Sequence, residues 1–125
     1  MTKKILVVDD EVALTKMVKM NLERTGEYEV RTENKGSMAL QAAQEFRPDL
    51  ILMDVMMPDM GGDEAMQDIR DDPDLTDTPY VFMTAIVTKE ETKEGGSTLG
   101  GPNEYLAKPV NTEELIETIE RLLGD

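Results

Sequence analysis

The stretch Leu50-Ile51-Leu52-Met53-Asp54-Val55-Met56-Met57-Pro58 decides how the rest of this chain is interpreted. Its first four residues are large and apolar, which is typical of a short strand buried on both faces of a parallel sheet. Pro58 cannot donate a ladder hydrogen bond, and Gly61-Gly62 follow, so the strand ends before them. Asp54 therefore stands at the carboxyl end of a central strand, where open α/β sheets bind ligands. Taken alone, an aspartate here more often caps the loop or the next helix.

The composition limits the class of protein. The 125 residues suit one domain, which we place at 1–125. A net charge of −14 argues against direct binding to nucleic acid, whose phosphates would be repelled. No apolar stretch is long enough to span a bilayer and no signal peptide is evident, so we expect a cytoplasmic protein without membrane insertion. The absence of Cys and His leaves carboxylates, lysines, hydroxyls and backbone groups for any chemistry.

Strand and helix patterns alternate along the chain. Strands are expected at 4–8, 28–32, 50–54, 80–83 and 104–107, and helices at 11–25, 39–47, 63–70 and from 111 onward. This alternation predicts an α/β fold in which a parallel sheet carries helices on both faces. The region 88–102 departs from it, because its glycines each disfavour a helix by about 1 kcal/mol and no apolar stripe is present.

Polar residues follow these strands where each strand ends, at one edge of the expected sheet: Asp9-Asp10, Asp54, Thr84 and Lys108. Converging carboxylates repel one another unless a cation lies among them, and oxygen ligands favour Mg²⁺ or Mn²⁺. Asp9-Asp10 alone would be interpreted as the start of a helix. Lys108 is expected to pair with Asp54, and Thr84 to offer a hydroxyl beside them. Such a carboxylate is suited to attack phosphorus and form an aspartyl phosphate.

Four segments resemble the receiver domain of two-component response regulators, across essentially the whole chain. They are Ile5-Leu6-Val7-Val8-Asp9-Asp10-Glu11, Asp54-Val55-Met56-Met57-Pro58-Asp59-Met60-Gly61-Gly62, Thr84-Ala85 and Tyr105-Leu106-Ala107-Lys108-Pro109-Val110. The resemblance, in particular to stand-alone regulators of the chemotaxis type, implies a flavodoxin-like five-stranded sheet of order 2-1-3-4-5. It also implies five helices, of which the fourth is short or irregular in this chain.

The resemblance further implies roles for individual residues. Asp54 accepts a phosphoryl group from a phosphohistidine of a sensor kinase or phosphotransfer protein, with Mg²⁺ as cofactor. Asp10 binds Mg²⁺ directly and Asp9 through water, while Asp54 and the Met56 backbone carbonyl supply further ligands. The chain is then no enzyme beyond its own phosphorylation and dephosphorylation.

Thr84 and Tyr105 resemble the switch pair of the family, which alters the face offered to an unknown downstream protein. Tyr105 also fits a simpler interpretation, as an aromatic core residue. Core and loop packing, not metal binding, is expected for the neighbouring methionines, because thioethers prefer soft ions. These are Met53, Met56, Met57 and Met60.

Three other functions are compatible with parts of the pattern. A phosphatase of the haloacid-dehalogenase type needs a second Asp two residues after the nucleophile, where this chain has Met56. A flavin carrier needs a phosphate-binding loop after the first strand, where Asp9-Asp10 would repel phosphate. A receiver that binds partners without phosphorylation is the third alternative, and the intact acceptor set argues against it.

Overall fold

A single parallel sheet organises the computed structural model, which describes residues 2–85 and 104–124. Its strands are β1 (Lys3–Val8), β2 (Tyr28–Glu33), β3 (Leu50–Asp54), β4 (Tyr80–Thr84) and β5 (Glu104–Ala107). All neighbouring strands pair in parallel, in the order β2-β1-β3-β4-β5. The predicted flavodoxin-like sheet is therefore confirmed. The region 88–102, for which a short or irregular fourth helix was predicted, lies outside the described residues.

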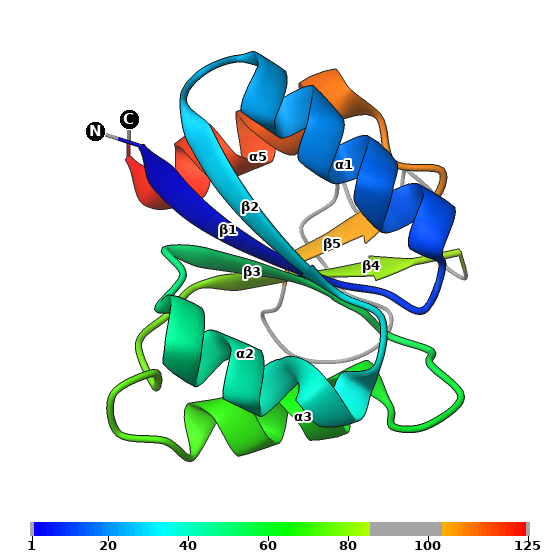
Figure 1. Ribbon diagram of the computed structural model, residues 1–125, viewed down its shortest axis with the longest axis vertical. Coiled ribbons are helices and arrows are strands. Elements are labelled where there is room, and N and C mark those ends of the chain that lie inside the picture. The colour runs from blue at the N-terminus through cyan, green and yellow to red at the C-terminus, as the bar shows by residue number, and fades with distance from the viewer. Residues whose placement is uncertain (1, 86–103, 125) are drawn as a thin grey trace.

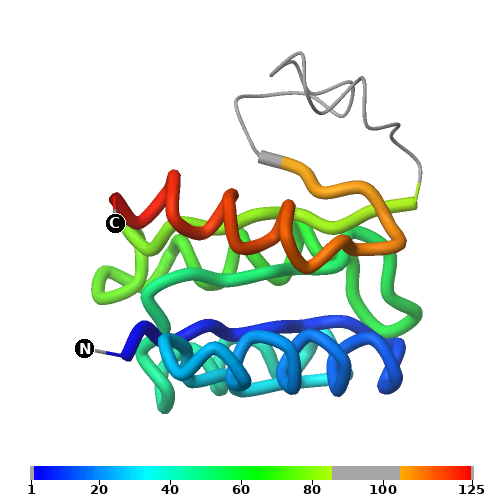
Figure 2. The backbone as a smooth tube through the Cα atoms, turned by 90° about the horizontal axis from the view of Figure 1, so that it is seen from above, coloured from blue at the N-terminus to red at the C-terminus, as the bar shows by residue number. Residues whose placement is uncertain are grey.

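Helices cover both faces of this sheet (Figure 1). They are α1 (Val12–Arg24), the 3₁₀ turn η1 (Gly36–Met38), α2 (Ala39–Phe46), α3 (Gly62–Arg70) and α5 (Thr112–Leu123). In Figure 1, α1 and α5 lie on one face, and α2 and α3 on the other. Figure 2 shows that β1 begins and α5 ends on the same side of the molecule. Among the described residues, no helix is long and apolar enough to cross a membrane.

Two apolar cores lie on opposite faces of the sheet, because alternate residues of a strand point to opposite sides. On the α1–α5 side, Ile5, Val7, Leu50, Leu52, Val81 and Met83 pack with Val18, Leu22, Leu115 and Ile119. On the α2–α3 side, Leu6, Val8, Ile51, Met53 and Phe82 pack with Ala39, Ala42, Ala43, Ala65, Met66 and Ile69. Every residue of β3 is buried, as predicted for the central strand.

The start of α3 lies directly against the end of β3. Gly62 N–H donates to the Val55 carbonyl at 2.8 Å. A Cβ at Gly62 would overlap the Asp54 carbonyl oxygen, so only glycine allows this approach. Close packing of this turn fixes the backbone of the residue that ends the central strand.

Several predicted boundaries differ from the structure by a residue or two. β4 includes Thr84 as its last residue, one residue beyond the predicted strand 80–83. Its apolar run predicts burial of all four residues, which is wrong for Tyr80, because that residue is only partly buried. Helix α2 ends at Phe46, because Arg47 takes a left-handed conformation with φ of 55° before Pro48. Asn111, where the last helix was expected to begin, is the N-cap of α5, and its side chain accepts from Glu114 N–H at 3.1 Å.

Candidate functional site

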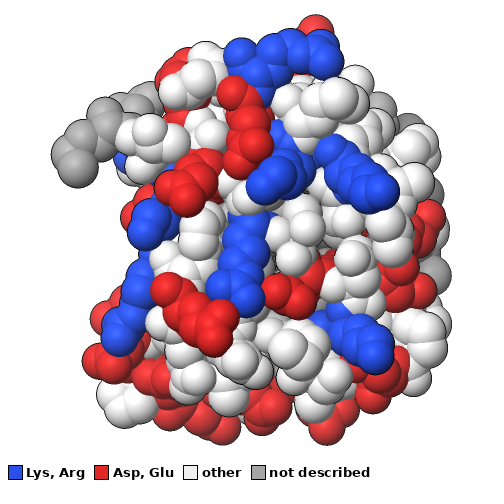
Figure 3. All heavy atoms as spheres, in the orientation of Figure 1, with Lys and Arg blue, Asp and Glu red and all other residues white. Residues whose placement is uncertain are grey.

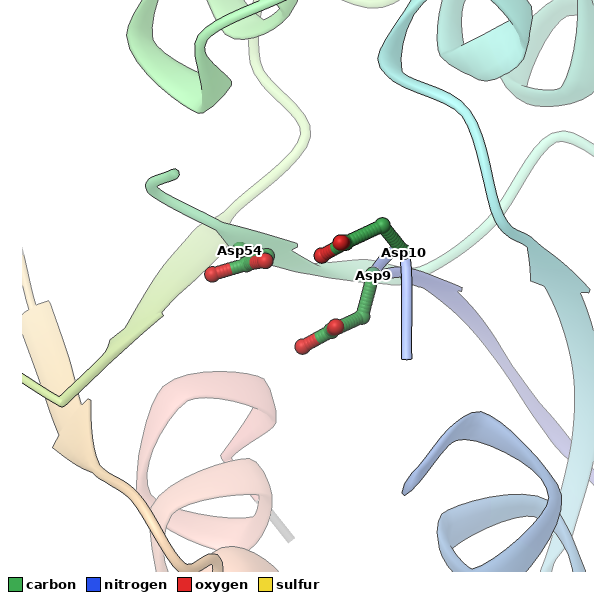
Figure 4. Close-up of side chains that lie close together, drawn as sticks. All are labelled: Asp9, Asp10 and Asp54. Carbon is green, nitrogen blue, oxygen red and sulfur yellow. The ribbon is translucent and has the colours of Figure 1, made fainter. Parts of the chain in front are cut away.

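Three aspartates meet where the neighbouring strands β1 and β3 end. Asp9 and Asp10 follow β1, and Asp54 is the last residue of β3. One carboxylate oxygen from each lies within 4.8 Å of the others, and Figure 4 shows Asp9 and Asp10 reaching from β1 toward Asp54. Asp9 is fully buried and Asp54 is 3% exposed, whereas Asp10 is open to solvent. The predicted convergence of these carboxylates is present.

Parallel pairing explains why these residues meet. Val8 is opposite Met53, and Asp54 is opposite Met83, so β1, β3 and β4 end at neighbouring positions. Val55 N–H then donates to the Met83 carbonyl at 3.0 Å and continues the ladder by one bond. The registers are held by buried apolar side chains on both faces, so the acids lie together without any attraction of their own.

Lys108 follows β5 and places its ammonium between the acids. Its Nζ lies 2.7 Å from Asp9 Oδ2 and 3.3 Å from Asp54 Oδ1, so the predicted pair with Asp54 is present. A third partner, which the sequence did not suggest, is Glu11, whose Oε1 lies 2.9 Å from Nζ. In the sequence, Glu11 belongs to the predicted start of a helix and lies 97 positions before Lys108. No short-range pattern in the sequence could reveal this contact.

Burial and like charge shift the pKa values of this cluster. Burial, followed by the negative charge of Asp9, raises the pKa of Asp54 to about 6, although Lys108 acts in the opposite direction. Burial lowers the pKa of Lys108, but its bonds to Asp9 and Glu11 outweigh burial and raise the pKa overall. The ammonium of Lys108 stays charged, and its single positive charge is shared among several carboxylates, so Asp54 is only partly neutralised. One ammonium does not balance three carboxylates.

The donor set fits a hard divalent cation. Apart from the Lys108 ammonium, the buried Asp9 Oδ2 has no partner among the described residues. All candidate ligand atoms are oxygens, and the chain has no His or Cys to attract zinc. Magnesium needs few protein ligands, since it keeps several waters. A cation among Asp9, Asp10 and Asp54 would counter the effects of burial and of the Asp9 charge that raise the pKa of Asp54.

Met56 lies in the loop that leaves β3. Its backbone N–H points at Asp54 Oδ1, at a long 3.4 Å. Its side chain is 66% exposed, so the expectation that it packs in the core or loop is wrong for this methionine. Met53 and Met57 are buried, and Met60 is partly buried, as expected for them. The exposed side chain faces solvent because β3 has ended and the loop runs over the surface. That the Met56 carbonyl ligates a metal remains a prediction.

Thr84 and Tyr105 share the α2–α3 face of the sheet with Phe82. Thr84 is two residues after Phe82 on β4, and Phe82 is opposite Tyr105 on β5. Thr84 is 2% exposed, and Tyr105 is partly buried with its ring stacked on Phe82 at 5.5 Å and 27°. The stacking fits both interpretations of Tyr105, as core residue and as switch, and its role in a switch remains a prediction.

Asp59 fixes the loop that follows β3 through a contact that no local sequence pattern indicates. Its two carboxylate oxygens accept Gly36 N–H at 3.1 Å and Ser37 N–H at 3.0 Å, at the start of η1. The bonds from Ser37 lower the pKa of Asp59. A Cβ at Gly36 would lie 3.0 Å from the Met60 carbonyl oxygen, so loop and turn are in close contact. The partners are more than twenty residues apart, which hides the contact from local patterns.

Comparison with known proteins agrees with this geometry. The family model described as response regulator receiver domain matches residues 5–120. The polar-differentiation response regulator DivK of Brucella anthropi is 37% identical over 125 residues, which cover 100% of this chain and 99% of the relative.

Solved structures show the same similarity. The chemotaxis protein CheY4 of Vibrio cholerae is 36% identical, with a TM-score of 0.83 over 98% of this chain and 100% of the other. The receiver domain of sensor histidine kinase PA1611 of Pseudomonas aeruginosa is 29% identical, with a TM-score of 0.83 and full coverage of both chains. That structure holds a magnesium ion in its active site cleft. With its sheet order, its site at the carboxyl ends of β1, β3 and β5, and this family match, the chain belongs to the response regulator receiver domains.

Proposed function

We propose that this protein is a phosphoacceptor switch in which Asp54 carries the phosphoryl group. The observation that carries the proposal is the position of Asp54, a nearly buried carboxylate within 3.3 Å of an ammonium and beside two further acids. The phosphodonor is a phosphohistidine of a sensor histidine kinase or of a phosphotransfer protein. Relatives that carry the name response regulator support this class of donor.

Phosphoryl transfer at this site forms one bond and breaks one. An Asp54 Oδ attacks phosphorus, the P–N bond of the phosphohistidine breaks, and its electron pair returns to the imidazole nitrogen. Lys108 neutralises charge on the phosphoryl oxygens, and the Thr84 hydroxyl, at the end of the neighbouring strand, binds one of them.

Magnesium is the cofactor that the donor set fits. Asp9, Asp10, Asp54 and the Met56 backbone carbonyl would hold it. When bound, Mg²⁺ supplies the positive charge that the single ammonium lacks. The PA1611 receiver domain, which has a magnesium ion in its active site cleft, supports this assignment by similarity.

A downstream protein then recognises the altered face around Thr84 and Tyr105. Both side chains lie on the face of the sheet that Phe82 occupies, so a movement of the Thr84 hydroxyl toward a phosphate changes the packing around Tyr105. The protein catalyses only its own phosphorylation and dephosphorylation. It acts in the cytoplasm, where phosphohistidine donors draw on ATP.

Nucleic acid is not a partner in this proposal. The net charge is −14, and in Figure 3 Lys and Arg side chains are interspersed with Asp and Glu, with no continuous basic patch on the face shown. Among the ion pairs of the described residues, Lys19 pairs with Glu23, and Arg31 with Glu33 and Glu45. A phosphate backbone therefore finds no broad basic footprint there.

Phosphorylation by acetyl phosphate in the presence of Mg²⁺ tests the proposal. We expect one adduct, which mass spectrometry maps to Asp54 and which is lost in Asp54→Asn. Asp68→Asn, an exposed aspartate on α3, serves as the matched control and should react like wild type. An equal yield of adduct from Asp54→Asn would refute the assignment.

A further inference from the structure

Glu11 holds the ammonium of Lys108 more closely than the proposed acceptor does. The Nζ lies 2.7 Å from Asp9 and 2.9 Å from Glu11, but 3.3 Å from Asp54. The Glu11 side chain is 60% exposed, against 13% for that of Lys108, so water is a ready alternative partner for Glu11. Its carboxylate nevertheless reaches inward to the lysine, from the β1–α1 turn to the residue after β5.

Helix capping does not explain the presence of this glutamate. Glu11 occupies the N-cap position of α1, where Ser, Thr, Asp and Asn are preferred, and its side chain makes no capping hydrogen bond. Its backbone is fixed by two bonds: Glu11 N–H donates to Asp9 Oδ1 at 2.8 Å, and its carbonyl accepts from Thr15 N–H at 3.2 Å. The backbone of Glu11 is thus held in place, while its side chain can bind either Lys108 or water.

The three contacts of Lys108 differ in how easily they can be given up. An ammonium has three N–H donors, and three carboxylates already surround it. Release of Asp9, which is fully buried, would leave a desolvated charge without a partner, at a cost of several kcal/mol. Release of Glu11 costs little, because exposed ion pairs contribute about 1 kcal/mol or less. A phosphoryl oxygen that arrives at Asp54 therefore displaces Glu11.

We propose that Glu11 is a positioning residue that limits Lys108 to its long 3.3 Å contact with Asp54 in the unphosphorylated protein and releases the ammonium when a phosphoryl oxygen arrives. The inference rests on the proposed function, because the phosphoryl group at Asp54 is the competitor. Glu11 therefore weakens phosphoryl binding and acts against the active state. It also adds negative charge near the cation site, which favours Mg²⁺.

Two variants separate the contact from the charge. Glu11→Asp keeps the charge but is one methylene shorter and loses the 2.9 Å contact, whereas Glu11→Gln loses the charge of the pair. Beryllofluoride serves as the phosphoryl mimic, at saturating Mg²⁺. We expect both variants to bind it about two- to five-fold more tightly than wild type. Mg²⁺ alone should bind Glu11→Asp like wild type and Glu11→Gln more weakly. Asp63→Asn removes an exposed charge at the start of α3, away from Lys108, and controls for net charge.

A spectroscopic measurement makes the test independent of phosphorylation. The ¹⁵Nζ resonance of Lys108 in the unphosphorylated protein should shift in both Glu11 variants and not in Asp63→Asn. If wild type takes no adduct at Asp54, the proposed function fails, and the resonance still reports whether Glu11 holds the lysine. If wild type is phosphorylated but Glu11→Asp binds beryllofluoride no more tightly than wild type, Glu11 is a bystander and the inference alone is overturned.

Discussion

Replacement of Asp54 by asparagine should stabilise the metal-free protein at neutral pH, although Asp54 is the proposed acceptor. Burial, with the charge of Asp9, raises the pKa of this carboxyl to about 6 from its ordinary 3.8. The charged form is therefore unfavourable in the folded state. An amide of the same shape carries no charge into the site, and Lys108 keeps Asp9 and Glu11 as partners in the variant.

The sign and size of the effect follow from the two pKa values. The unfolded chain loses the Asp54 proton near pH 3.8, whereas the folded protein keeps it to about pH 6. Stability from this group is thus fully present below about pH 4 and is lost as the pH rises through 6. The difference between these two pKa values corresponds to about 3 kcal/mol of unfolding free energy, at 1.36 kcal/mol for each pH unit. About half of it, roughly 1.4 kcal/mol, develops between pH 5 and pH 7.5.

Urea unfolding in EDTA measures this difference directly. A pI near 4.3 makes work below pH 5 impractical, so wild type, Asp54→Asn and the exposed control Asp68→Asn are compared from pH 5 to pH 7.5. The gap in unfolding free energy between Asp54→Asn and wild type should widen by about 1.4 kcal/mol over this range, while the control stays parallel to wild type. A gap that does not change with pH, or a less stable variant at pH 7.5, would refute the reasoning.

Three further predictions concern the surroundings of Asp54. Asp10→Ala should abolish the rise in Tm that Mg²⁺ causes and leave the metal-free protein at least as stable; an unchanged Mg²⁺ effect would place the cation elsewhere. Met56→Asn should shorten the lifetime of the adduct, because the exposed side chain at this position gains a group that can orient water; equal decay of the aspartyl phosphate would remove the argument. Asp59→Ala removes the hydrogen bonds to Gly36 and Ser37, so it should lower the free energy of unfolding by about 1–2 kcal/mol and weaken Mg²⁺ binding. Urea unfolding and calorimetric titration measure these two quantities, and the control Asp63→Ala should leave both close to wild type.

The sheet and the site edge could be predicted because they depend on local signals. Apolar runs such as 50–53 mark strands, and a parallel sheet brings the ends of those strands to one edge whatever the details of packing. Asp9, Asp54 and Lys108 meet for this reason alone, and the ion pair between Asp54 and Lys108 follows from it. The strand order was predicted from the family resemblance, because the apolar pattern by itself does not show which strands pair with each other.

The contacts that the sequence did not predict bring an exposed carboxylate to a partner far away in the chain. Glu11 and Lys108 are 97 residues apart in the sequence, and Asp59 and Gly36 are 23 residues apart. Each of these carboxylates is also compatible with full exposure to water. Neither the hydrophobic periodicity nor the secondary-structure propensity of the sequence therefore indicates its partner. Met56 is the opposite case, an apolar residue for which the sequence predicted packing. It follows a buried strand but is 66% exposed.

The aspartates of the site are held together by the packed sheet and not by their own charges. Leu52 and Met53 on β3, and Val7 and Val8 on β1, are fully buried and set the register that forces the acids together. Apolar burial therefore offsets an electrostatic cost of about 3 kcal/mol at Asp54. Whatever brings positive charge to the site relieves this cost, so occupancy and fold stability are coupled by linkage. The parts free to respond are those whose contacts are exposed, and among the described residues around Lys108 the exposed contact is that of Glu11.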